Sequence, residues 1–363
     1  MQLEEILEPI LITYNRKELL NKTLNQLVAD NSPIRECQII ILDNASDDGT
    51  QELCENFVKC HQNFKYIRNP KNVGIAGNII KSMELVSKKW LWVICDDDYF
   101  HWKCWSEVEK ALFEDYDIVM TNRNGIKCEY PYLINEASFL PNAIYNTKHI
   151  NETTIKNAYG IAHTLLPHHA ITCKVINEKG KIFSPENYGG CVAAGNNDVN
   201  KKDYVNQKDE NLYFKYADYN IIQGYVNAYR LIKDEKVRQE CMEVLCQGET
   251  FKNSMAYFLQ LNPKGSLDAL FEVLISSNKR QMKDLIGQIM FGDDITRKNY
   301  CGFVMFNMSY LIINYIKSIR KLIIKIGYNS DYVNLHIFNM HIKIKNNVII
   351  KKMYEWKKRH AKR

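Results

Sequence analysis

Short apolar runs alternate with amphipathic stretches along roughly the first 120 residues. Residues 9–14 (PILITY), 38–42 (QIIIL), 65–68 (KYIR), 90–95 (WLWVIC) and 117–121 (DIVMT) predict five strands. Residues 17–30, 50–61 and 75–89 have helical periodicity, and Asn15 and Glu18 have the spacing of a capping box at the first helix. Because the strands are apolar throughout and are separated by helices, the pattern predicts an α/β fold with a mostly parallel sheet covered on both faces.

The pattern changes after this part of the chain. Residues 131–224 are irregular and rich in Asn, Gly and His, and residues 225–291 contain four helical stretches. We therefore expect one domain over residues 1–225, with halves 1–125 and 126–225, and a helical region over residues 226–308. Residues 309–363 complete the chain as a basic amphipathic helix, residues 309–326, and a tail, because apolar residues and lysines fall on different faces at helical spacing.

Composition excludes several classes of protein. The chain has 363 residues, of which 46% are hydrophobic and 25% charged, as in globular proteins. It has no run of about 20 uninterrupted apolar residues, and its acidic start, MQLEEILEPI, does not resemble a secretory signal peptide. The 11 cysteines are scattered, odd in number and form no CxxC pair, so we expect reduced thiols and a cytoplasmic protein.

The positive charge is concentrated at the C-terminus. The whole chain has a formal net charge of +6, but residues 317–363 hold 13 Lys or Arg against 2 Asp or Glu, which leaves −5 for the rest. Basic residues near Tyr354 and Trp356 favour an anionic membrane surface as the partner of this region. Packing on the protein's own helices is the alternative for the amphipathic helix, and the acidic body argues against nucleic acid.

Polar residues follow the predicted strands, where parallel sheets bind their ligands. They are residues 13–15, 43–48 and 96–98, and the last group is three consecutive aspartates. The chain has neither GxGxxG after the first strand nor GxxxxGK[ST], which argues against dinucleotide oxidoreductases and P-loop NTPases. Neighbouring carboxylates repel one another unless a cation lies among them. A hard divalent ion with substrate phosphates suits them, and a solvated acidic turn is the alternative.

Four linked motifs resemble the nucleotide-sugar half of family 2 glycosyltransferases. They are ILITYNR, IIILDNASDDGT, RNPKNVGIAGN and WLWVICDDDYF, within residues 8–125. The last two most resemble bacterial abequosyltransferase-like enzymes, which build surface polysaccharides such as lipopolysaccharide or capsule. The resemblance implies the GT-A fold and a metal-dependent, inverting transfer of a hexosyl or deoxyhexosyl group. The implied donor is a nucleotide-sugar, with a UDP-sugar preferred, and the implied acceptor is a lipid-linked glycan at the inner face of the cytoplasmic membrane.

The resemblance also assigns residues to the site. It implies that the nucleotide-sugar is bound by Thr13, Tyr14, Asp43, Asn78, Asp96 and Asp97, and that Mn²⁺ or Mg²⁺ is held by Asp98 and Asp96 in a DXD motif. Two departures from the family pattern matter. Gly77 stands where many relatives have an Arg, and Cys95 occupies a position that is Asp elsewhere, which leaves Asp96/Asp98 and Asp97/Asp98 as alternative functional pairs.

The general base is less distinct in the sequence. Asp198 lies at the family's usual distance from the metal motif, with Glu186 and Asp203 as alternatives, and each has a second interpretation as an ordinary loop carboxylate. His163, His168 and His169 lack a cysteine at ligand spacing, so we expect an acceptor contact or loop packing rather than zinc. Trp102 and Trp105 stack on a sugar or belong to the core.

Two other functions remain open. The first is a catalytically degenerate GT-A protein that binds nucleotide-sugar or glycan, suggested by Gly77 and by the lack of a clear base motif. The second is a sugar nucleotidyltransferase. That activity needs a Gly-rich, basic phosphate loop after the first strand, and TYNRKE is not such a loop.

Overall fold

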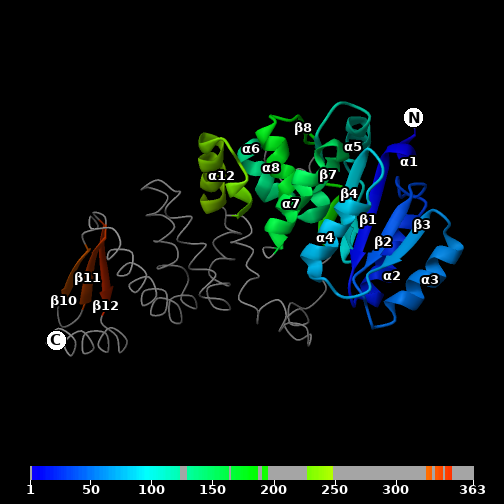
Figure 1. The fold of residues 1–363 in the computed structure, drawn as a ribbon, viewed down its shortest axis with the longest axis horizontal. Coiled ribbons are helices and arrows are strands. Elements are labelled where there is room, and N and C mark those ends of the chain that lie inside the picture. The colour runs from blue at the N-terminus through cyan, green and yellow to red at the C-terminus, as the bar shows by residue number, and fades with distance from the viewer. Residues whose placement is uncertain are drawn as a thin grey trace. The chain divides into compact units, whose positions relative to one another are not determined.

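The computed structural model describes residues 2–122, 129–162, 165–186, 190–194 and 227–247, together with three strands between residues 324 and 345. The chain forms two compact units, Met1–Gly248 and Glu249–Arg363. The first unit contains the sheet and helices drawn from blue to yellow-green in Figure 1. The division after Gly248 differs from the expected boundaries at residues 225 and 308.

A seven-stranded sheet forms the centre of the first unit, in the order β3-β2-β1-β4-β7-β6-β8. Strands β1 to β4 are parallel to one another, whereas β7 is antiparallel to both of its neighbours, β4 and β6. The sheet is therefore mostly parallel, as predicted. The strands are β1 (Leu7–Thr13), β2 (Ile39–Asp43), β3 (Phe64–Arg68), β4 (Trp90–Cys95), β6 (Ile118–Met120), β7 (Ala143–Asn146) and β8 (Ile182–Phe183).

Helices follow the strands and confirm the three that the periodicity predicts near the N-terminus. Those three are α2 (Lys17–Val28), α3 (Thr50–Cys60) and α4 (Gly74–Leu85). The other described helices are α1 (Leu3–Ile6), α5 (Trp105–Leu112), α6 (Tyr130–Ala137), α7 (Glu152–Gly160), α8 (His169–Asn177), α12 (Glu235–Gln247) and the 3-10 turns η1 (Leu140–Asn142) and η2 (Thr147–His149). Helix α12 packs against α6, so it belongs to the first unit.

The hydrophobic core lies on both faces of the sheet. On β4, Trp90, Trp92 and Ile94 join a buried cluster that includes side chains of α2, α3 and α5. Leu91 and Val93 are equally buried but lie outside that cluster. Successive side chains of a strand point to opposite faces, so this alternation places the second core on the α4 side. Burial on both faces explains why the strands are continuous apolar runs.

Two features of the first unit differ from the sequence prediction. Asn15 does not cap α2, because the N–H of Lys17 donates to Asp48 Oδ2 at 2.9 Å and the Asn15 side chain accepts from Asp47 N instead. In addition, Asp98 is not in a turn. It begins a short strand, β5 (Asp98–Phe100), which pairs antiparallel with β9 (Val192–Ala194) and brings Asp98 opposite Ala194.

The second unit contains a three-stranded antiparallel sheet in the order β10-β11-β12. Its strands are β10 (Ile324–Tyr328), β11 (Tyr332–Ile337) and β12 (Met340–Lys345). The expected helix over residues 309–326 is therefore wrong at its C-terminal end, where residues 324–326 form a strand, and residues 309–323 lie outside the described part. The alternation of isoleucine and lysine at residues 324–326, in β10, is a strand pattern that the helical interpretation overlooked. Among the described helices, none has the length and apolar character needed to cross a membrane.

Candidate functional site

The ends of three parallel strands bring the motif residues to one edge of the sheet. Thr13 at the end of β1 pairs in register with Asp43 at the end of β2, and Ile12 pairs with Cys95 at the end of β4. The loops that follow these strands therefore start side by side. This is the edge at which parallel α/β sheets bind ligands, and the structure confirms that the sequence motifs converge there.

The loops after β1 and β2 are joined by hydrogen bonds. Asn15 adopts a left-handed backbone conformation, with φ of 50°, and its N–H donates to Ser46 Oγ at 2.9 Å while its Oδ1 accepts from Asp47 N at 2.8 Å. Asp48 binds Lys17 N and also Thr50 N, so it caps α2 and α3 together. These contacts fix the shape of the edge without any ligand.

Asp96 is buried between Thr13 and Arg16. Its side chain accepts from Thr13 Oγ1 at 2.7 Å and from Arg16 Nη1 at 3.0 Å, and the same Nη1 lies 3.1 Å from Asp97 Oδ2. Burial raises the pKa of Asp96 to about 6, because desolvation outweighs the attraction of Arg16, and the charge of Asp97 raises the pKa further. Arg16, in the TYNR motif, is a site residue that the sequence analysis missed. The signal that could have found it is a basic residue in the loop after one strand when the neighbouring strand of the sheet ends in aspartates.

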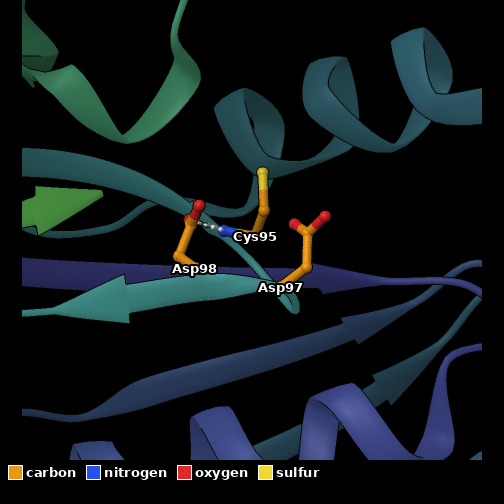
Figure 2. A group of neighbouring side chains, drawn as sticks. All are labelled: Cys95, Asp97 and Asp98. Atoms are coloured by element: carbon orange, nitrogen blue, oxygen red, sulfur yellow. Dashed lines mark hydrogen bonds between the residues drawn. The ribbon is translucent and has the colours of Figure 1, made fainter. Parts of the chain in front are cut away.

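Cys95, Asp97 and Asp98 form a second group of side chains at this strand end (Figure 2). The Cys95 sulfur and one carboxylate oxygen of each aspartate lie within 4.8 Å of one another. Asp98 is 4% exposed, and its Oδ2 accepts from Cys95 N at 2.8 Å. The structure thus brings Asp97 and Asp98 together, whereas the oxygens of Asp96 bind Thr13 and Arg16. It favours the Asp97/Asp98 pair over the Asp96/Asp98 pair.

The donor set of this group suits a divalent cation. Burial raises the pKa of Asp98 well above its usual value, with Asp97 and Asp96 raising it further, so a cation beside the carboxylate would stabilise its charged form. Carboxylate oxygens suit both Mg²⁺ and Mn²⁺, but a thiol is a softer ligand that magnesium does not prefer. The residues present therefore fit Mn²⁺ better than Mg²⁺.

Asp43 is completely buried and already bound by internal donors. Its Oδ1 accepts from Ser46 N and Oγ at 3.0 and 2.6 Å, and its Oδ2 accepts from Tyr66 OH at 2.7 Å and lies 3.4 Å from Arg68 Nε. A carboxylate has about four lone-pair positions. A base or ribose contact at Asp43 therefore has to replace one of these donors, and its role in nucleotide binding stays a prediction.

Asn78 belongs to a chain of asparagine contacts. Its Oδ1 accepts from Asn69 Nδ2 at 2.9 Å, and Asn69 also donates to Asn44, whose own amide donates to Asn72 Oδ1 at 2.7 Å. Asn78 Nδ2 donates to Leu42 O at 3.1 Å, so the chain ties α4 to the ends of β2 and β3. Asn78 is buried. In this structure it holds the loops in position, and a direct ligand contact stays a prediction.

The acceptor-side residues are only partly described. Asp198, Asp203 and His163 lie outside the described residues. Glu186 is exposed, and its N–H donates to Glu107 Oε2 at 2.7 Å.

Three of the remaining histidine and tryptophan candidates are buried, and Trp102 is partly buried against the core. His168 and His169 are buried, and desolvation lowers the pKa of His168 to about 4, so these two neutral rings belong to the packing. Trp105 is buried and stacks on Trp92, and Trp102 stacks on Phe100. The described geometry therefore supports packing rather than acceptor contact for His168 and His169, and a core position rather than sugar stacking for Trp102 and Trp105.

The seven-stranded, mostly parallel sheet with its covering helices has the arrangement of the GT-A fold. Two solved structures share this fold: S. aureus TarS superposes with a TM-score of 0.53 at 12% identity, covering 94% of this chain and 60% of that one. The fragment TarS 1-349 gives 0.51 at 13% identity, covering 94% and 99%. Residues 10–180 match Glycosyl transferase family 2. The match to this family model confirms the resemblance that the sequence motifs show within residues 8–125.

Relatives of known sequence agree with this assignment. Abequosyltransferase RfbV of Salmonella typhimurium is 31% identical over 119 residues, which are 32% of this chain and 35% of the relative. A mycoplasma protein named uncharacterized glycosyltransferase MG025 homolog, from Mycoplasma pneumoniae, is 28% identical over 101 residues, or 28% of this chain and 34% of the relative. The matched region spans about a third of the length of these relatives.

Proposed function

We propose that this chain transfers a sugar from a nucleotide-sugar donor to a glycan acceptor. The single observation that carries the proposal is the convergence of Cys95, Asp97 and Asp98 at the sheet edge that parallel α/β folds use for ligands. The family 2 match over residues 10–180 supplies the reaction class. Three acidic or thiol side chains in contact at that edge suit the diphosphate of such a donor when a divalent cation lies between them.

Each residue around this edge has a distinct task. Asp97 and Asp98 would hold the cation, and Cys95 would be its third ligand from the chain. The cation, when bound, offsets negative charge on the leaving diphosphate. One guanidinium nitrogen of Arg16 contacts both Asp96 and Asp97, and the Thr13 hydroxyl donates a hydrogen bond to Asp96. Asp97 is thus held in position before the donor binds, which lowers the entropy cost of ordering the site.

The finer assignments rest on the relatives and on sequence distance. We propose an inverting displacement in which Asp198, or alternatively Glu186 or Asp203, takes the proton of the acceptor hydroxyl. The name of the Salmonella relative supports transfer of a hexosyl or deoxyhexosyl group. A UDP-sugar is the first donor to test, and a lipid-linked surface glycan, of the kind used for lipopolysaccharide or capsule, is the proposed acceptor.

The decisive experiment compares two variants with the unsubstituted 363-residue chain. Nucleotide-sugar consumption with Mn²⁺, with and without acceptor, should be lost in the Asp97→Asn/Asp98→Asn double variant. Asp115→Asn is the matched control, because Asp115 is an exposed aspartate that lies outside the Cys95–Asp98 group. Undiminished turnover in the double variant, at unchanged thermal stability, would refute the proposal. Tight binding of nucleoside diphosphate without turnover in the wild type would favour the degenerate binding protein.

We also propose that residues 317–363 bring the protein to anionic lipid at the inner face of the cytoplasmic membrane. The concentration of 13 Lys or Arg in this segment supports it. Sedimentation with vesicles that contain phosphatidylserine should decrease when Lys351, Lys352, Lys357, Lys358 and Arg359 are changed to Gln. Replacing five lysines of the first unit, at positions 22, 59, 65, 71 and 81, is the charge-matched control. Equal sedimentation of both variants would contradict this part.

A further inference from the structure

Two buried cysteines that are distant in the sequence meet beside the site. Cys104 lies just before α5 and Cys191 just before β9, and the two are 1% and 0% exposed. Their sulfur atoms are 2.7 Å apart although 87 positions separate them. Non-bonded carbon atoms rest about 3.5–4.0 Å apart, and sulfur is larger. The two thiols are therefore closer than ordinary packing would place them, and a shift of less than about 1 Å would bring them to the length of a disulfide bond.

The surrounding backbone holds both residues in this position. Cys191 N and Cys104 Sγ both donate to the carbonyl oxygen of Thr121, at 2.9 and 2.8 Å. The carbonyl of Cys191 in turn accepts from His101 N at 2.8 Å and Trp102 N at 3.2 Å, in the segment that leads to Cys104. A covalent bond between the sulfurs would therefore join two segments that are already hydrogen-bonded to each other.

The hydrogen bond between the thiols makes them chemically unequal. The S–H of Cys191 is the donor to Cys104 Sγ in the arrangement that leaves the Cys104 S–H for Thr121 O. This bond lowers the pKa of Cys104, although burial opposes it, and the same bond together with burial raises the pKa of Cys191. Cys104 is thus the thiol that ionises more readily, and a thiolate is the nucleophilic form of cysteine.

We propose that Cys104 and Cys191 are a redox-active pair that hydrogen peroxide converts reversibly into a disulfide. In the first step Cys104 sulfur attacks one peroxide oxygen, the O–O bond breaks, and Cys104 sulfenic acid and one water form. In the second step Cys191 sulfur attacks the sulfenic sulfur and a second water leaves. One peroxide is reduced to two waters, and two thiols lose two electrons and two protons. A small dithiol reverses the reaction by thiol–disulfide exchange.

The bond would act on the strand beside the carboxylate group. Cys191 continues directly into β9, and β9 pairs with β5, so that Ala194 lies opposite Asp98. A disulfide would therefore link the start of β9 to the start of α5, because Cys191 immediately precedes β9 and Cys104 immediately precedes α5. Among the cysteines that the structure describes, this pair would then depart from the expected reduced thiols when the protein is oxidised. The inference does not depend on the proposed sugar transfer.

Peptide mapping tests the pair directly. The full-length protein is treated with hydrogen peroxide, remaining thiols are blocked with N-ethylmaleimide under denaturing conditions, and the digest is analysed by mass spectrometry with and without dithiothreitol. We expect a Cys104–Cys191 cross-linked peptide that dithiothreitol removes. We also expect a higher melting temperature for the oxidised wild type, because the cross-link restricts the unfolded chain.

Two controls separate this pair from general oxidation. Cys60 is exposed and shows that peroxide reached the protein, and Cys54→Ala removes a buried thiol outside the pair. Cys54→Ala should keep the oxidative increase in melting temperature, whereas Cys104→Ala and Cys191→Ala should lose it. Recovery of both Cys104 and Cys191 as free thiols, under conditions that oxidise Cys60 in folded protein, overturns the proposal. That result needs only the wild type, so a variant that fails to fold does not affect the test.

Discussion

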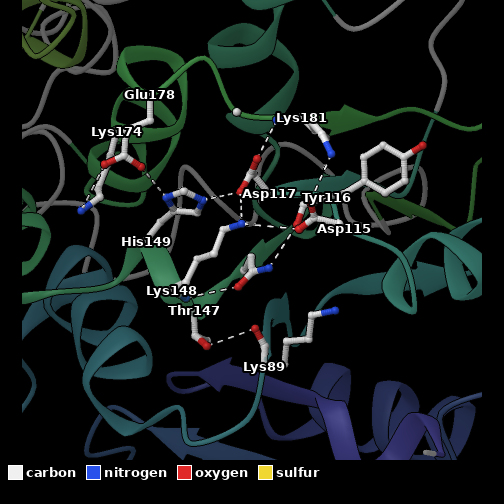
Figure 3. A network of polar contacts seen from close by, with 12 residues as sticks. Lys89, Asp115, Tyr116, Asp117, Thr147, Lys148, His149, Lys174, Glu178 and Lys181 are labelled. Carbon is white, nitrogen blue, oxygen red and sulfur yellow. Dashed lines mark hydrogen bonds and ion pairs between the residues drawn. The ribbon is translucent and has the colours of Figure 1, made fainter.

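Two groups of acidic residues at opposite ends of the same sheet differ in how their buried carboxylates are paired with basic side chains. At the end of β4, residues 96–98 place three carboxylates together with Arg16 as the cation that contacts two of them. Beyond the other end of the sheet, Asp117 accepts from Lys148 Nζ at 2.6 Å and from His149 Nε2 at 2.7 Å (Figure 3). His149 is in turn 2.9 Å from Glu178 through its other ring nitrogen.

The pKa values record this difference. Burial raises the pKa of Asp96 to about 6 and that of Asp98 well above its usual value. Burial also acts on Asp117, but hydrogen bonds from Lys148 and His149 outweigh it and lower the pKa to about 2. The Asp117 network neutralises itself and needs no ligand. In the residue 96–98 group, the neighbouring aspartates add to the rise in the pKa of Asp96 and Asp98, and a bound cation would stabilise their charged forms, which is the pattern expected of a site.

The largest expected effect is on turnover when Asp98 is changed. Asp98→Asn should reduce turnover by at least about 100-fold, as for the loss of other electrostatic groups in active sites. The same variant should melt at the wild-type temperature or higher. Asparagine can still accept from Cys95 N, and it removes a buried charge. Steady-state kinetics and thermal denaturation measure the two quantities, and a large fall in melting temperature would instead make Asp98 structural.

The opposite result is expected for Asp117. Asp117→Ala removes the partner of Lys148 and His149 and the acceptor of Lys181 N. Because it leaves Lys148 Nζ, His149 Nε2 and Lys181 N without the acceptor that they share, it should lower the free energy of unfolding by about 3 kcal/mol. Urea denaturation measures this change. Nucleotide binding by the folded fraction should be unaltered, and a loss of binding at unchanged stability would contradict the distinction between the two groups.

The third expected effect is a loss of the stability that Asp117 contributes when the pH is lowered. The pKa of Asp117 is lower in the folded protein, about 2, than its ordinary value of 3.8. The contribution of this carboxylate is therefore present above about pH 4 and is lost as the pH falls from 4 to 2, and it amounts to roughly 2 kcal/mol. Because other carboxylates titrate in the same range, the measurement is the difference between wild type and Asp117→Asn. That difference should shrink by this amount between pH 5 and 2, and a constant difference would contradict it.

The sequence predicted the part of the fold that depends on local patterns. Parallel strands buried on both faces are continuous apolar runs, so β1 to β4 were found within one or two residues of their ends. The polar ends of β1, β2 and β4 could be placed at one edge for the same reason. Strand β7 was not predicted, because it comes from a later, irregular part of the chain and enters the sheet between β4 and β6, antiparallel to both.

The choices that the sequence left open at this edge have a common physical cause. Whether Asp96 or Asp97 groups with Asp98 depends on which carboxylate Thr13 and Arg16 bind, and these are contacts across about 80 positions of sequence. The capping of α2 by Asp48 similarly comes from the next loop rather than from Asn15. Long-range pairs of this kind leave no periodic signal. Residue types at the strand ends were therefore predictable, whereas their partners were not.

The smallest expected effect, and the most specific test of the residue 96–98 group, concerns Cys95. If its sulfur is a ligand beside Asp97 and Asp98, Co²⁺ added as a spectroscopic substitute should show a thiolate-to-metal charge-transfer band. Cys95→Ser should abolish the band and weaken Mn²⁺ binding by about tenfold, close to 1.4 kcal/mol. It should change Mg²⁺ binding less, because magnesium prefers oxygen. Cys60→Ser is the matched control, since Cys60 is an exposed thiol outside the group. A band that survives Cys95→Ser would restrict the cation to the two carboxylates, and the contrast with Asp117 would then rest on charge alone.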